Sequence, residues 1–109
     1  MAGKVRTLLV DDSAAIRRLL TELVDADPAL EVVGTAADGA AALQEIERLA
    51  PDAVVLDLEM PVLDGLATLQ ALRRSWPRLP VVMFSSATER GADATLEARR
   101  VRPAGQQQR

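Results

Sequence analysis

Three aspartates that directly follow two short apolar runs are the residues best placed to do chemistry in this chain. The runs are Leu8–Val10, before Asp11 and Asp12, and Val54–Leu56, before Asp57. If the two runs are neighbouring parallel strands, the three carboxylates meet at one edge of a sheet. Crowded carboxylates raise one another's pKa unless a cation neutralises them. The sequence therefore predicts a site for a hard, oxygen-ligated cation, with Mg2+ as the first candidate.

The composition narrows the classes of protein that the chain can form. Its 109 residues suffice for one small domain. The absence of cysteine and histidine excludes disulfides, His-ligated zinc and Ser-His-Asp catalysis. A net charge of −3 gives no indication of nucleic-acid binding. No apolar run approaches the roughly 20 residues that span a bilayer, and no signal-peptide core precedes the first strand pattern. We therefore expect a cytoplasmic domain without a nucleic-acid or membrane partner.

Strand and helix patterns alternate along the chain. Buried strands are predicted at residues 5–10, 31–36, 53–56 and 81–84, with an amphipathic helix after each of the first three. Ser13 and Asp64 are predicted helix caps, and Asp38-Gly39 opens the second helix. A weakly patterned helix is expected at residues 92–100. The residues predicted to face inward from the three helices are Ile16, Leu19, Leu20, Leu23 and Val24; Leu43, Ile46 and Leu49; and Leu66, Leu69, Leu72 and Trp76.

Several conspicuous residues have ordinary structural interpretations. Asp64 is interpreted as a cap rather than an ion ligand, and Trp76 and Phe84 as core residues. Two arginine pairs, Arg17-Arg18 and Arg73-Arg74, are expected on solvated helix faces. Adjacent acids after a strand are often only favourable charges at a helix N-terminus, but the matching position of Asp57 favours the ion site.

This alternation predicts right-handed βαβ units and an open, doubly wound parallel sheet with helices on both faces. In such sheets, ligands bind beyond the carboxyl ends of the strands. Asp11, Asp12, Asp57 and Ser85 all follow a strand by one or two residues. The coincidence of the four indicates one site.

Four stretches resemble the receiver domains of two-component response regulators, and the resemblance covers residues 4–96. With the stretch from Leu30 to Gly39, they resemble most closely the regulatory domain of chemotaxis protein-glutamate methylesterases. The resemblance implies a flavodoxin-like fold with strand order 2-1-3-4. The stretches are Leu9-Val10-Asp11-Asp12-Ser13, Leu56-Asp57-Leu58-Glu59-Met60-Pro61, Asp64-Gly65 and Val81-Val82-Met83-Phe84-Ser85-Ser86-Ala87-Thr88.

The resemblance also implies a role for each site residue. Asp57 is the expected phosphoacceptor for a histidine kinase, in chemotaxis-related signalling. Asp12 is expected to ligate Mg2+ directly and Asp11 to help through water or hydrogen bonds, with Asp57 and the backbone carbonyl of Glu59 completing the protein ligands. Ser85 is expected to donate its hydroxyl to the phosphoryl group, and Ser86 is its small neighbour.

The family pattern fails after about Leu96, where a fifth strand ending in Lys-Pro is expected. The only lysine, Lys4, precedes the first strand, roughly 20 Å from the site at about 3.3 Å per residue. Arg102-Pro103 follows Ser85 too closely to be a substitute, and no strand pattern precedes Arg109. A guanidinium is also a planar fork rather than a compact ammonium. We therefore expect a receiver truncated before its fifth strand, either naturally or by a frameshift. Residues 97–109 are then a basic tail, disordered or extending the last helix.

Losing that strand would leave residues 81–84 as an exposed apolar edge, through which the chain could self-associate. Two functions remain open from the sequence. One is a phosphoacceptor signalling module, and the other is a truncated, switch-defective interaction fragment that keeps the ion site. An aspartate-nucleophile phosphatase is disfavoured because Asp57-Leu58-Glu59 lacks a second aspartate two residues on. No independent enzyme is expected, since the esterase part is absent.

Overall fold

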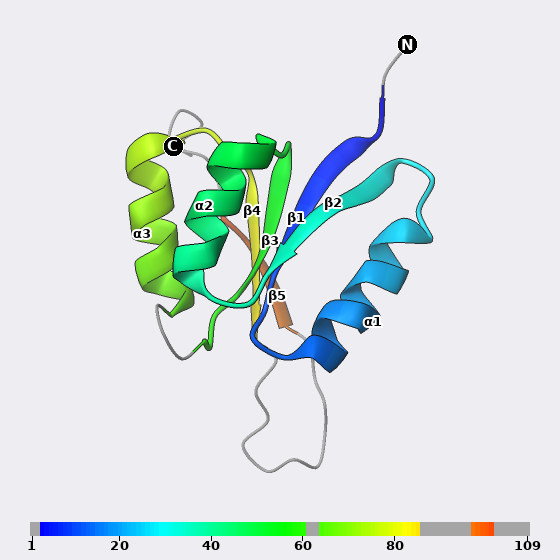
Figure 1. Ribbon diagram of the computed structural model, residues 1–109, viewed down its shortest axis with the longest axis horizontal. Helices are drawn as coiled ribbons and strands as arrows, with labels where there is room; N and C mark the ends of the chain where they lie inside the picture. The colour runs from blue at the N-terminus through cyan, green and yellow to red at the C-terminus, as the bar shows by residue number, and fades with distance from the viewer. Residues whose placement is uncertain (1–2, 61–63, 86–96, 102–109) are drawn as a thin grey trace.

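A parallel sheet forms the centre of the fold (Figure 1). The computed structural model describes residues 3–60, 64–85 and 97–101. Adjacent strands in the order β2-β1-β3-β4 are all parallel, as predicted. Their bounds are β1 (Val5–Val10), β2 (Leu30–Ala36), β3 (Ala53–Asp57) and β4 (Val81–Ser85), and those of the helices are α1 (Ala14–Asp25), α2 (Gly39–Leu49) and α3 (Gly65–Ser75).

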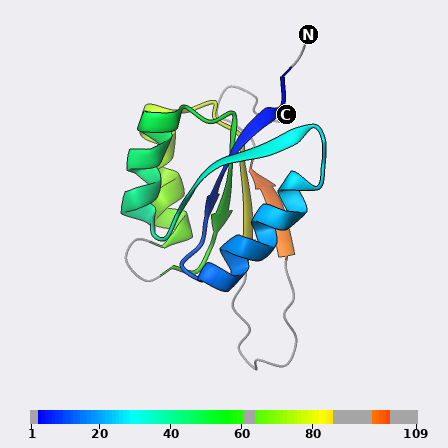
Figure 2. The ribbon, with the colours of Figure 1, turned by 45° about the vertical axis from the view of Figure 1, so that its right-hand side comes forward.

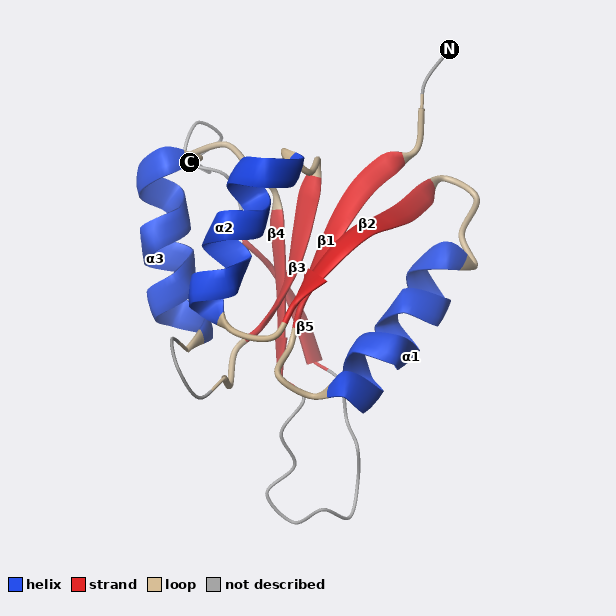
Figure 3. Ribbon diagram, in the orientation of Figure 1, coloured by secondary structure: helices blue, strands red, loops and turns tan. Residues whose placement is uncertain are grey.

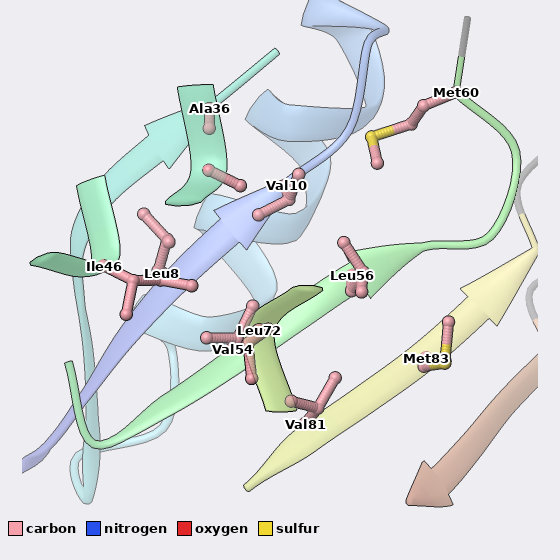
Figure 4. Close-up of a cluster of buried hydrophobic side chains, with 11 residues drawn as sticks. Leu8, Val10, Ala36, Ile46, Val54, Leu56, Met60, Leu72, Val81 and Met83 are labelled. Atoms are coloured by element: carbon pink, nitrogen blue, oxygen red, sulfur yellow. The ribbon is translucent and has the colours of Figure 1, made fainter. Parts of the chain in front are cut away.

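The helices cover the sheet from both faces, with α2 and α3 on one face and α1 on the other (Figure 3). The larger core lies under α2 and α3, where alternate strand residues such as Leu8, Val54 and Val81 meet Ile46 and Leu72 (Figure 4). A smaller cluster under α1 joins Leu9, Leu20 and Phe84. Strand residues alternate between the two clusters because successive side chains of a strand point to opposite faces.

Each described helix begins at a side-chain cap, and the sequence identified Ser13 and Asp64 as two of these caps. Ser13 Oγ accepts a hydrogen bond from the N–H of Ile16 at 3.2 Å. Asp38 Oδ1 and Asp64 Oδ1 each accept one at 2.8 Å from the residue three positions on. These bonds satisfy backbone donors of the first helical turn, which have no partner within the helix. The interpretation of Asp64 as a cap is confirmed.

The predicted inner faces of two helices are too wide. Leu19 and Leu23 of α1 are 43% and 56% exposed, and Leu66 at the start of α3 is 59% exposed. Helix α1 packs on the sheet through Ile16, Leu20 and Val24 instead. A helix resting on one sheet face buries only a narrow stripe, so leucines on its flank stay in contact with water.

A fifth strand corrects the expectation for the chain after Leu96. Strand β5 (Glu97–Val101) pairs antiparallel with β4, from Ser85↔Glu97 to Val81↔Val101. The prediction of a helix or disorder was therefore wrong for residues 97–101, and β4 is not an exposed edge. The physical reason is that strand pairing satisfies backbone N–H and C=O groups, which does not require the apolar run that the sequence lacks. The rest of the predicted helix, at residues 92–96, and the tail at 102–109 lie outside the described residues.

Arg73 also departs from the expectation of a solvated helix face. Its Nη1 donates to the carbonyls of Trp76 and Leu79 at 3.1 and 2.6 Å, so it joins the end of α3 to the turn before β4. Partial burial lowers the pKa of the Arg73 guanidinium from its ordinary value. Trp76 itself is half-buried against the larger core, and Phe84 is fully buried, as predicted.

None of the helices within the described ranges is long and apolar enough to cross a bilayer.

Candidate functional site

The register of the central strands brings the three predicted carboxylates together. Val10 of β1 pairs with Leu56 of β3, so Asp11 and Asp57, one residue further along, lie side by side. Asp12 follows from the same loop. Carboxylate oxygens of Asp11, Asp12 and Asp57, the acidic cluster, all lie within 4.8 Å of one another. The convergence predicted from the strand endings is confirmed.

Burial divides the acidic cluster. Asp11 and Asp57 are completely buried, whereas Asp12 is exposed. Desolvation raises the pKa of Asp11 from its ordinary 3.8 to about 6, against a hydrogen bond from the Ser13 backbone that lowers it. The Asp57 charge, a hydrogen bond to Asp57 and the Asp12 charge raise it further. At pH values below about 6, Asp11 therefore keeps a proton, which it can donate to Asp57 in a hydrogen bond.

The two carboxylate oxygens of Asp11 differ in their hydrogen-bond partners. Oδ1 accepts a hydrogen bond from the N–H of Ser13 at 2.7 Å. Oδ2 is buried and receives no hydrogen bond from any described group. A buried carboxylate oxygen without a donor is costly, and a cation removes that cost. With only carboxylate oxygens as donors, the cluster fits a hard divalent ion such as Mg2+.

Backbone geometry holds Asp57 in place. Asp57 Oδ1 accepts a hydrogen bond from the N–H of Glu59 at 3.1 Å. Behind it, Gly65 lies so close that an added Cβ would stand 2.5 Å from the Cα of Leu58 and closer still to the Asp57 carbonyl oxygen. Only glycine permits this approach of α3 to the end of β3. Asp64-Gly65 is one of the stretches that carry the family resemblance, but the sequence alone does not reveal this close approach.

Ser85 reaches the same edge of the sheet from β4. Asp57 pairs with Phe84, and the N–H of Leu58 donates to the Phe84 carbonyl at 2.7 Å, so Ser85 follows directly beside the site. Its hydroxyl donates to Glu59 Oε2 at 3.1 Å. The Glu59 side chain is exposed to solvent, yet it accepts this hydrogen bond from Ser85. Ser86 lies outside the described residues.

Arg17 lies next to the acidic cluster, whereas Lys4 lies at the opposite end of β1. Arg17, expected on a solvated face, is half-buried and donates from Nη1 to the Asp11 carbonyl at 2.7 Å, which secures the loop between β1 and α1. Lys4, the only lysine of the sequence, immediately precedes β1, so the whole strand separates it from Asp11 (Figure 2).

The fold and the site together define a doubly wound α/β domain with an acidic cluster at the carboxyl edge of its sheet. Residues 7–101 match the response regulator receiver domain family, and the chain belongs to that family. The resemblance stated from the motifs is thereby confirmed.

Known relatives agree with this assignment. The chain is 52% identical over 94 residues to a protein-glutamate methylesterase/protein-glutamine glutaminase of Nocardioides sp.. It is 57% identical over 94 residues to one of Xanthomonas campestris. Each alignment covers 86% of this chain and 26% of the relative, so the chain spans about a quarter of the length of these proteins.

Solved structures show the same fold. The response regulator domain of Thermotoga maritima CheB superposes with a TM-score of 0.72 and 42% identity, covering 82% of this chain and 66% of that one. CheY of Borrelia burgdorferi, solved in a complex with CheX, BeF3 and Mg2+, gives a TM-score of 0.70 at 30% identity, covering 78% and 65%.

Proposed function

We propose that this chain is a phosphoacceptor module of a two-component system, which takes a phosphoryl group from a histidine kinase on Asp57 and requires Mg2+. The observation that supports it best is the buried Asp57 carboxylate within 4.8 Å of the Asp11 and Asp12 oxygens, beside the Ser85 hydroxyl. We also propose a chemotaxis-related pathway and a cytoplasmic location, as the resemblance to the regulatory domain of chemotaxis methylesterases implies.

The chemistry assigns one task to each residue. An Asp57 carboxylate oxygen forms a bond to phosphorus while the bond from phosphorus to the imidazole nitrogen of a phosphohistidine breaks, and the electron pair leaves with that nitrogen. Asp12 holds Mg2+ directly, Asp11 holds it through water or hydrogen bonds, and Asp57 and the Glu59 carbonyl complete the protein ligands. When bound, Mg2+ supplies positive charge that neutralises the phosphoryl oxygens.

The remaining residues respond to the new group. Ser85 donates its hydroxyl to a phosphoryl oxygen, and Ser86 leaves room beside it. The two resting hydrogen bonds at this edge, from Glu59 N–H to Asp57 and from the Ser85 hydroxyl to Glu59, support this assignment because both Asp57 and Ser85 contact Glu59. The proposal concerns the phosphoacceptor site alone, and no hydrolase activity is proposed for this chain.

Phosphorylation of the purified chain tests the proposal. A small acyl phosphate and Mg2+ should add one phosphoryl group, detected by intact mass, and Asp57→Asn should abolish it. Asp12→Asn should slow it strongly, because the directly bound ligand is lost. Chelating the Mg2+ should stop it in the wild-type protein.

The alternative function, a switch-defective fragment, predicts a different result. Such a chain would bind Mg2+ yet show either no label on Asp57 or a label without any change in its amide NMR spectrum. A folded chain that takes no label with either an acyl phosphate or a phosphorylated histidine kinase would refute the phosphoacceptor proposal.

A further inference from the structure

The hydroxyl of Ser85 already has an acceptor in the resting structure. It donates to Glu59 Oε2 at 3.1 Å, a contact between residues 26 positions apart in the sequence. The backbone N–H of Glu59 in turn donates to Asp57 Oδ1 at 3.1 Å. Glu59 thus contacts the proposed nucleophile through its backbone and the proposed switch hydroxyl through its side chain.

These two contacts put Glu59 in competition with a phosphoryl group. A serine hydroxyl has one proton, so it donates one good hydrogen bond at a time. A phosphoryl group on Asp57 would add strong acceptor oxygens beside the same hydroxyl. Ser85 can turn to that group only by leaving the Glu59 carboxylate. The Glu59 carboxylate also repels the added negative charge as long as it stays near the site.

We propose that Glu59 is a positioning residue that holds Ser85 in its resting arrangement and releases it when Asp57 is phosphorylated. The inference rests on the proposed function, because it concerns the same hydroxyl and the same nucleophile. Phosphorylation then exchanges one hydrogen bond for another: the Ser85 proton moves from facing a Glu59 oxygen to facing a phosphoryl oxygen. The Glu59 carboxylate is freed into solvent, where its exposed position allows it to move.

The size of the effect follows from the kind of contact. Glu59 is exposed and Ser85 only half-buried, so their hydrogen bond is worth little more than a typical one. Because the phosphoryl analogue must break this hydrogen bond in order to bind Ser85, the bond should weaken binding by about two- to tenfold. Removing the Glu59 side chain removes that cost, so binding should tighten by the same factor.

Beryllofluoride, a phosphoryl analogue, tests the competition at saturating Mg2+. Dissociation constants are measured by NMR titration for the wild type, Glu59→Ala, Ser85→Ala and the double variant. Glu59→Ala should tighten binding two- to tenfold when Ser85 is present and clearly less in the Ser85→Ala background. The exposed Glu47 of α2 offers a control with the same loss of charge, and Glu47→Ala should leave the dissociation constant unchanged.

A second measurement detects the restraint in the resting protein. Unfolding free energies of the same four proteins in EDTA form a double-mutant cycle, and Glu59 and Ser85 should show a favourable coupling. With Mg2+ and beryllofluoride present, that coupling should disappear. Equal tightening by Glu59→Ala in both backgrounds, or no resting coupling, would overturn the proposal.

Phosphorylation of Asp57, measured separately, distinguishes the two possible failures. If Asp57 takes a label while the cycle shows no coupling, only the role of Glu59 is wrong. If the folded wild type takes no label and binds no beryllofluoride, the proposed function and the role of Glu59 are both wrong.

Discussion

Replacing Asp11 by asparagine should stabilise this domain when Mg2+ is absent. The carboxyl group of Asp11 is completely buried beside Asp57 and within reach of Asp12, and one of its oxygens receives no hydrogen bond. Asparagine has nearly the same shape and cannot ionise. Its carbonyl oxygen can still accept from the Ser13 N–H, and its amide can donate toward Asp57.

The magnitude follows from the pKa of Asp11. The folded protein raises it from 3.8 to about 6. A shift of about two units corresponds to about 3 kcal/mol, which the folded state loses once Asp11 is ionised. Well below its ordinary pKa of 3.8 the group is protonated in both the folded and the unfolded chain, so it has no effect there. As the pH rises from 4 to above 6, the unfolded chain releases the proton first and the folded state is progressively destabilised.

The assay compares unfolding free energies of the wild type and Asp11→Asn in EDTA between pH 4 and 8. The advantage of the variant should grow from about 0.5 kcal/mol at pH 4 to as much as about 3 kcal/mol at pH 7, or a rise in Tm on the order of 10 °C. Adding Mg2+ at pH 7.5 should stabilise the wild type and raise the variant much less. Glu47→Gln, an exposed loss of one negative charge, should change neither profile.

Two results would refute this reasoning. One is a variant less stable than the wild type at pH 7.5 in EDTA, which would mean that the Asp11 charge is already compensated. The other is an advantage that does not depend on pH between 4 and 7, which would show that ionisation of Asp11 is not its cause.

Three further substitutions test the elements that position the site. Gly65→Ala should cost about 1–3 kcal/mol in urea unfolding and slow the labelling of Asp57, because its Cβ would meet the Asp57 carbonyl; an unchanged stability would contradict the close approach. Ala50→Gly should raise the stability by about 1 kcal/mol, since Ala50 ends α2 with φ 48°, and a lower Tm would argue against strain there. Arg73→Ala should cost about 1–2 kcal/mol through two lost hydrogen bonds, whereas exposed Arg74→Ala should stay within about 0.5 kcal/mol; equal effects would refute the role of Arg73.

Much of the fold and of the site could be predicted because the signals are local. Apolar runs of strand length predicted the four parallel strands, and apolar residues at helical spacing predicted the three helices. Ser13 and Asp64 could be identified as the caps of α1 and α3 from the few residues that follow each of them. Parallel strands bring their carboxyl ends to one edge. For that reason, Asp11, Asp12 and Asp57 could be placed together before any contact was known.

Other features depended on residues far apart in the chain. Strand β5 pairs with β4 through backbone groups, which every residue type carries, so residues 97–101 need no apolar pattern that the sequence could reveal. The widths of the helix faces, and hence the exposure of Leu19 and Leu23, depend on what packs against α1 rather than on its own spacing.

The acidic cluster shows the same division at the scale of single residues. The sequence alone determined which carboxylates meet, because their places follow from where strands end. Only the tertiary structure decided that Asp11 is buried while its neighbour Asp12 is exposed, and that Ser85 donates to Glu59. The side chains of residues that are adjacent in the chain can point in different directions, and burial and long-range hydrogen bonds depend on where each side chain points.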